Sequence, residues 1–136
     1  MMKSIFLLLA SLSAMTGVGL GAFGAHGLKN VLSPELLTVY QTGVTYQMWH
    51  ALGLMGIALL HQQAAESKLI NWAGWLMFIG IILFSGSLYL LAILDLKWIG
   101  IITPIGGVSF IMAWVLIAIF ATTTKKHNSR YKNARS

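Results

Sequence analysis

The stretch from Gln41 to Leu60, QTGVTYQMWHALGLMGIALL, decides the fold. Most of it is apolar, yet it carries Tyr46, Gln47 and His50 close together. Residues three or four positions apart share a face of a helix, so we expect these three side chains on one face. A helix over residues 42–61 would match the thickness of a bilayer and place His50 about 12 Å from one end, near the midplane. The polar groups must then find partners inside the protein.

The composition of the chain indicates a membrane protein. Of its 136 residues, 57% are hydrophobic and 9% are charged, whereas a soluble domain carries about 25% charged residues. So few charges cannot cover a surface that faces water, and a surface that faces lipid is the better interpretation. The chain has no cysteine, which excludes disulfides, thiolate metal sites and cysteine nucleophiles.

The net charge of +6 could suggest a nucleic-acid partner, but the basic residues are concentrated in one tail. A basic tail beside apolar segments is typical of a membrane-flanking segment, so we expect no nucleic acid as a partner. The basic residues of the tail are Lys125, Lys126, Arg130, Lys132 and Arg135.

Four apolar segments predict an all-α integral membrane four-helix bundle, a single domain over residues 1–121. The expected spans are 4–25, 42–61, 70–92 and 103–121, followed by a basic cytoplasmic tail over 122–136. Four spans place both termini on one side, and the excess of Lys and Arg there predicts that both are cytoplasmic in a cell inner membrane. A secretory signal peptide is the alternative for the first segment, but three further spans favour a membrane helix.

Helix ends can be predicted from local signals. The sequence Ser33–Glu35 combines a capping serine, a proline and an acidic residue, which predicts a helix start. Thr103–Pro104 predicts the start of the last helix in the same way, and that helix is expected to end near Ala121. Gly27 is expected to cap the first helix, with His26 at its negative end.

Small residues at helical spacing predict close packing of the first two helices. Such a stripe lets the backbone of a neighbouring helix approach and gain dispersion contacts. The stripe runs through Ala10, Ala14, Gly17, Gly21 and Gly24. Further packing positions are expected at Gly53, Gly86, Gly106 and Gly107.

Four blocks of sequence resemble a known family. They are Gly21–Leu28 (GAFGAHGL), Tyr46–Leu52 (YQMWHAL), Phe84–Tyr89 (FSGSLY) and Thr103–Gly107 (TPIGG). Together and in this order they resemble the transmembrane protein 256 family of small four-helix membrane proteins. The resemblance covers nearly the whole chain except the tail after Thr122. It implies an inner-membrane protein of four helices and implies no particular activity.

The polar side chains in the spans form a candidate ligand or proton site. Ionisable residues in membrane spans are costly, and a histidine near the midplane could relay protons or bind a ligand. The alternative is a structural His50 that hydrogen-bonds a neighbouring helix, which the lack of acidic residues in the spans favours. The candidates are Tyr46, Gln47, His50, Ser85, Ser87, Tyr89 and His26, with Thr103.

We expect neither a metal nor a cofactor. His26 lies near the outer interface, about 12 Å from the depth of His50, whereas a metal needs ligand nitrogens about 2 Å away. Ser85 or Ser87 beside His50 could suggest a hydrolase, but an orienting acid is missing, so we expect no enzyme.

The leading functional hypothesis is a non-enzymatic membrane protein that binds lipid, a small apolar ligand or a membrane protein partner complex. The alternative is an oligomeric proton-linked or small-solute conduit that uses the His50 site. Four helices in one copy leave little room for a pore, so the conduit needs an oligomer. We expect a homo-oligomer in either case.

Overall fold

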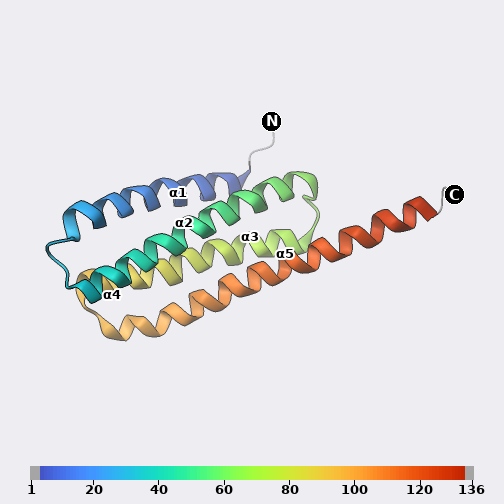
Figure 1. The fold of residues 1–136 in the computed structure, drawn as a ribbon. Coiled ribbons are helices and arrows are strands. Elements are labelled where there is room, and N and C mark those ends of the chain that lie inside the picture. Colours follow the sequence, from blue (N-terminus) through green and yellow to red (C-terminus); the bar gives the residue numbers. More distant parts are fainter. Residues whose placement is uncertain (1–3, 134–136) are drawn as a thin grey trace.

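The computed structural model describes residues 4–133, with side chains described as far as Thr123, as four helical rods joined by short connections (Figure 1). No strand occurs among these residues, which confirms the all-α prediction. The first rod is α1 (Ile5–Phe23) with the π-helical turn η1 (Gly24–Leu28), and the second is α2 (Pro34–Gln63). The third rod is α3 (Lys68–Gly80), the π-helical turn η2 (Ile81–Ser85) and α4 (Gly86–Leu94). The fourth is the 3₁₀ turn η3 (Lys97–Ile101) and α5 (Ile102–Asn133).

Consecutive rods run antiparallel and pack in chain order. Helix α1 packs against α2, α2 against the third rod, and the third rod against α5. The start of α1 and the end of α5 therefore lie toward the same end of the bundle (Figure 1). The second and third rods form the middle of the bundle, and the first and fourth flank them.

Three of the four rods are long and apolar enough to cross a membrane: Ile5–Leu28, Lys68–Leu94 and Lys97–Thr123. Helix α2, for which a span over residues 42–61 is predicted, is not among them. Polar residues such as Gln47 and His50 lower its mean hydropathy, and both are buried. Helix α2 can lie inside a membrane because its neighbours cover much of its polar surface.

The start of α2 follows the sequence prediction. The Ser33 hydroxyl accepts a hydrogen bond from the Leu36 N–H at 3.3 Å, Pro34 opens the helix and Glu35 lies in its first turn. Thr103 does not cap α5, because helical structure begins at Lys97 and the Thr103 hydroxyl pairs with Ser87 instead. A capping signal therefore decides a helix start only where no preceding turn supplies the bonds.

Two predicted helix ends are wrong. Gly27 lies inside the turn η1 and is not a C-cap, since none of the described glycines has a positive φ. Helix α5 continues past Ala121 to Asn133, since residues 122–133 contain no glycine or proline to end it. The side chains of the basic residues from Lys125 on, and all of Arg135, lie outside the described residues.

Glycines allow close approach between rods, as predicted for α1 and α2. A Cβ at Gly21 would lie 3.3 Å from Val44, and one at Gly24 would overlap the Tyr40 ring. A Cβ at Gly17 would likewise overlap the Met48 side chain.

The packing predictions outside α1 have mixed outcomes. Gly53 meets Trp114, and Gly106 lies against the backbone of Phe84, so both pack closely. Gly107 makes only ordinary contact with the ring of Phe84. Gly86 has no atom within 4 Å of a Cβ position, so the packing prediction is wrong there.

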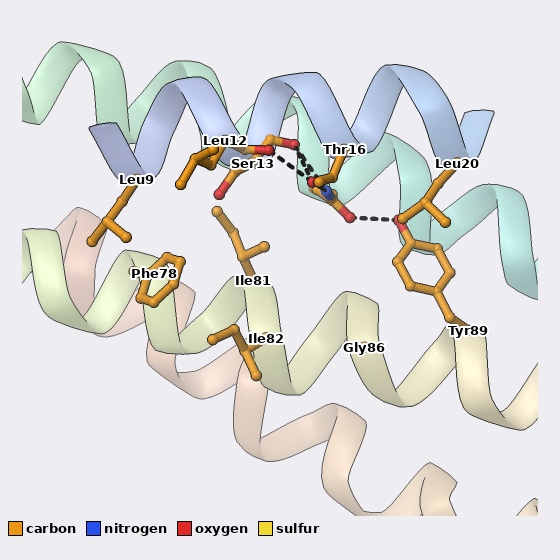
Figure 2. A pocket seen from close by; sticks show the side chains of 11 residues that line it. Leu9, Leu12, Ser13, Thr16, Leu20, Phe78, Ile81, Ile82, Gly86 and Tyr89 are labelled. Carbon is orange, nitrogen blue, oxygen red and sulfur yellow. Dashed lines mark hydrogen bonds between the residues drawn. The ribbon is translucent and has the colours of Figure 1, made fainter. Parts of the chain in front are cut away.

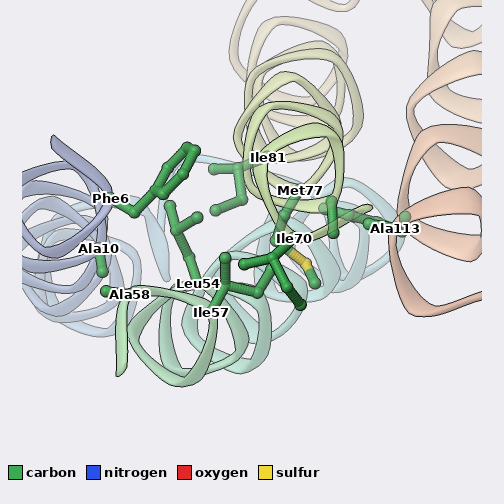
Figure 3. Packing of buried hydrophobic residues seen from close by; sticks show 11 residues of the cluster. Phe6, Ala10, Leu54, Ile57, Ala58, Ile70, Met77, Ile81 and Ala113 are labelled. Carbon is green, nitrogen blue, oxygen red and sulfur yellow. The ribbon is translucent and has the colours of Figure 1, made fainter. Parts of the chain in front are cut away.

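An apolar cluster fills the bundle toward the end where α1 begins. Phe6 of α1, Leu54 of α2 and Ile81 of η2 converge there (Figure 3). Met77 of α3 and Ala113 of α5 belong to the same cluster. Tyr40 and Gln47, which bond α1, come from earlier turns of α2 than Leu54 and so lie further from this end of the bundle.

Candidate functional site

Gln47 is the centre of a hydrogen-bonded hub that joins three helices. Its side chain is only 5% exposed. Its Nε2 donates to the Ser13 carbonyl and to the Thr16 hydroxyl of α1, both at 2.9 Å. Its Oε1 accepts from the Tyr89 hydroxyl of α4 at 2.7 Å. The carboxamide has both donors and an acceptor, so one side chain can bind two neighbours at once.

The sequence prediction included Gln47 and Tyr89 but missed Ser13 and Thr16. The available signal was their position on α1, where Ser13 lies three residues after Ala10 on the small-residue face. That face therefore supplies polar groups to the hub as well as small residues for packing.

His50 faces inward, as predicted, and is 7% exposed. Its Nδ1 lies 2.8 Å from the carbonyl oxygen of Tyr46 on the same helix. A carbonyl can only accept, so Nδ1 carries the hydrogen. The expected hydrogen bond to another helix is wrong, because the carbonyl one turn earlier satisfies Nδ1. The contact with another helix is a ring stack on Phe110 of α5, with centroids 3.5 Å apart.

The prediction that the three central polar residues of α2 share one face is wrong. Tyr46 lies beside the ring of Phe84 at 4.6 Å and stacks with His50 at 5.9 Å. These two residues are directed to η2 and α5, whereas Gln47 is directed to α1 and α4. One residue step rotates a helix by about 100°, so Gln47 reaches a different neighbour from Tyr46.

The predicted serines connect rods and do not approach His50. Ser85 donates to the Gly43 carbonyl of α2 at 2.7 Å, and its hydroxyl is buried there. The Ser87 hydroxyl pairs with that of Thr103 on α5 at 2.7 Å. The serine–histidine pair that could suggest hydrolysis is therefore not assembled.

Two further hydrogen bonds between rods were missed by the sequence prediction. The Tyr40 hydroxyl donates to the Leu20 carbonyl, and Ser109 donates to the Leu76 carbonyl, both at 2.6 Å. His26 is exposed in η1 and takes no part in the hub. Within the described side chains, every buried nitrogen or oxygen has a hydrogen-bond partner.

A groove of about 360 Å³ lies between α1 and the third rod, next to the hub (Figure 2). Ser13, Thr16, Gln47 and Tyr89 lie along its floor. Gly86 leaves one wall open, because it has no side chain and no neighbour within 4 Å of a Cβ position. The rest of the wall is apolar, from Leu9, Leu12, Leu20, Phe78, Ile81 and Ile82. The groove therefore offers a hydrocarbon surface over a polar floor.

A second groove, of about 620 Å³, lies between α2 and α5. Trp49 and Trp114 stand on its sides, and Gly53 and Gly56 lie on α2 between them. Polar side chains are scarce along it, with Gln63 at one end. It lacks the hydrogen-bonded floor of the first groove.

Comparison with known proteins places the chain in a family. The family model "Protein of unknown function (DUF423)" matches residues 20–107. A UPF0382 membrane protein of Staphylococcus saprophyticus is 51% identical over 115 residues, which cover 85% of this chain and 94% of the relative. The UPF0382 membrane protein YwdK of Bacillus subtilis is 48% identical over 117 residues, covering 86% and 95%. No solved structure matches the chain.

These similarities agree with the resemblance to the transmembrane protein 256 family. The matched residues include the hub residues Gln47 and Tyr89 and the whole of the second and third rods. The relatives are named as membrane proteins, which agrees with the apolar rods. The chain belongs to the DUF423 family of membrane proteins of unknown function.

Proposed function

We propose that this protein crosses the inner membrane four times and binds the hydrocarbon chain of a lipid in the groove between α1 and the third rod. Three rods have the length and hydropathy for a crossing, and the antiparallel arrangement requires α2 to return between them. The side of the termini carries most of the basic residues, which supports a cytoplasmic position for both ends.

The open wall at Gly86 is the observation that carries the lipid proposal. A side chain there would narrow the groove, whereas glycine leaves room beside the apolar wall. The volume of about 360 Å³ falls in the range of roughly 300 to 1,000 Å³ found for small-molecule sites. A lateral groove in a membrane protein is open to lipid, so a hydrocarbon chain is the most available occupant.

The hub supports an apolar ligand and not a polar one. Both donors and the acceptor that Gln47 uses are already bonded within the protein. A ligand with strong polar groups would have to break these bonds, whereas a hydrocarbon chain would not. Binding would then depend on shape and dispersion contacts along the apolar wall.

We propose a binding role and not an enzymatic one, since the hydroxyls of Ser85 and Ser87 are used between rods. The conduit alternative receives less support. Within the described residues, the one hydrogen bond of the His50 ring joins Nδ1 to the carbonyl oxygen of Tyr46 on the same helix, which provides no path to another rod.

Native mass spectrometry of the full chain in mild detergent tests the lipid proposal. The wild type should retain one lipid, and Gly86→Leu should lose most of it by filling the groove. Gly19→Leu is the matched control, because Gly19 also has no neighbour within 4 Å but does not line the groove. Equal lipid retention by Gly86→Leu and the wild type, or a wild type free of lipid, would overturn the proposal.

A further inference from the structure

Helix α2 has an exposed stripe that is polar in its first half. Thr38, Gln41 and Thr45 are exposed and follow one another at helical spacing, and Trp49 continues the stripe. Thr38 donates to the carbonyl of Pro34 on its own helix. Gln41 and Thr45 have no side-chain hydrogen bond within the part of the chain that the structure describes. Two adjacent turns therefore present unpaired polar groups to the outside.

The stripe lies at a depth where the other rods expose apolar side chains. Tyr40, next to Gln41, contacts Gly24 of the first rod and the Tyr89 ring of α4 at 5.1 Å. Next to these contacts, Phe23 is 50% exposed and Leu90 is 48% exposed. Both side chains belong to rods that are long and apolar enough to cross a membrane, Ile5–Leu28 and Lys68–Leu94. Where lipid chains cover the level of Gln41, an unpaired carboxamide is unfavourable, because the chains offer it no hydrogen bond.

We propose that this stripe is the contact surface for a second copy of the same chain, with the Gln41 carboxamides of the two copies hydrogen-bonded to each other. A carboxamide has a donor and an acceptor, so two of them are complementary. Copies inserted in the same direction are related by a two-fold axis along the membrane normal, which brings identical residues together at equal depth. Thr45 then meets the partner's Thr45 one turn further along.

Several features favour this partner over lipid. The stripe is the outer face of the only rod that falls short of the hydropathy of a membrane span, within the described residues. A second copy would pair the exposed polar groups of the stripe, and this pairing would need neither a charged partner nor a bound ligand. The stripe lies on α2, away from the wall formed by Gly86, so dimerisation is independent of the lipid groove.

Cysteine cross-linking in native membranes tests the interface directly. The chain has no cysteine of its own, so each variant has a single thiol. Under mild oxidation, Gln41→Cys and Thr45→Cys should give a disulfide-linked dimer. Leu90→Cys is the matched control at the same depth on α4 and should stay monomeric. The proposal would be overturned if Gln41→Cys gave no more disulfide-linked dimer than Leu90→Cys. It would also be overturned if the cross-link joined the chain to a different protein.

Native mass spectrometry gives a second, independent measurement. The wild type should be dimeric, and Gln41→Leu should raise the dimer dissociation constant about tenfold by removing the paired hydrogen bonds. Gly86→Leu should leave the dimer unchanged, which separates this proposal from lipid binding. A monomeric wild type, or a Gln41→Leu protein that dimerises as well as the wild type, would contradict the interface.

Discussion

Helix α2 buries Gln47, His50 and Tyr40, whereas α5 exposes Ile111, Val115 and Ile119 along its outer face. Helix α2 is connected to its neighbours by directional hydrogen bonds through Gln47, Ser85 and Tyr40. Helix α5 also bonds the third rod, through Thr103 and Ser109, but no described side chain of α5 forms a hub like that of Gln47. Its distinctive contact is close approach, since Gly106 lies against the backbone of Phe84.

The difference shows two ways to position a helix where water is absent. Lipid is as apolar as a leucine side chain, so burying apolar surface gives little driving force between helices. Helix α5 therefore depends on dispersion contacts at short distance in addition to its two hydrogen bonds with the third rod. Helix α2 can be more polar because its hydrogen bonds are protected from competition by lipid. Substitutions that remove close approach in α5 or hydrogen bonds in α2 should show how much each kind of contact contributes to stability.

The largest loss of stability is expected for Gly106→Ala in α5. The new Cβ would collide with the Phe84 backbone, which cannot move aside as a side chain can. The two rods would have to separate, at a cost of about 3 kcal/mol in the free energy of unfolding. Unfolding in mixed micelles with increasing SDS measures this. Gly56→Ala is the control in open space, and an equal loss in both variants would contradict the close-approach explanation.

A somewhat smaller effect is expected for Gln47→Leu in α2. The variant loses the bonds to Ser13, Thr16 and Tyr89 and leaves the Tyr89 hydroxyl without its acceptor. Membrane hydrogen bonds contribute about 0.6 kcal/mol each, so three predict a loss of about 2 kcal/mol. The same SDS titration checks it. If Gln47→Leu were as stable as the control Gln62→Leu, in which the changed residue is exposed, the hub would not stabilise α2.

His50→Phe should change stability by less than about 1 kcal/mol. Phenylalanine keeps the ring stack on Phe110 and loses only the bond to the carbonyl of Tyr46. Proton flux into liposomes is the second measurement on the same protein. A pH-dependent flux in the wild type that disappears in His50→Phe would support the conduit and contradict a structural role.

The smallest change in stability is expected at the start of α2, which is outside the apolar part of the bundle. A backbone N–H and the Ser33 hydroxyl bond the Glu35 carboxylate and lower its pKa from the usual 4.5. A group whose pKa is lower in the folded state stabilises the fold above its unfolded pKa. That contribution is lost as the pH falls below 4.5 and through the lowered pKa.

The difference in unfolding between wild type and Glu35→Gln should therefore shrink as the pH falls from 6 toward about 3. Helix α5 has no acidic residue in its first turn, so its start should contribute no such pH dependence. A constant difference between the two proteins across this range would show that Glu35 does not stabilise α2 through its charge.

Local signals predicted what depends on neighbours in the sequence. Ser33–Glu35 marks the start of α2 because a cap needs only the next turn of the same helix. The stripe of Gly17, Gly21 and Gly24 predicted close packing because small residues at helical spacing share a face. The sequence also identified Gln47 and Tyr89 as polar groups that need partners.

The choice of partner depends on rods that are distant in sequence. Whether His50 bonds another helix or its own carbonyl depends on where Phe110 lies, and Gln47 reaches Ser13 only after α1 and α2 meet. Whether Gly86 packs or opens a groove depends on the gap between α1 and the third rod.

By itself the sequence determined the membrane class, the all-α architecture and the polar residues that could not face lipid alone. Hydropathy and helical periodicity are properties of single segments, so they can be read without neighbours. Only the tertiary structure decided which side chain satisfies which, and which turn of α2 is left exposed. A hydrogen bond needs two groups within about 3 Å, and that distance is set by how the rods pack.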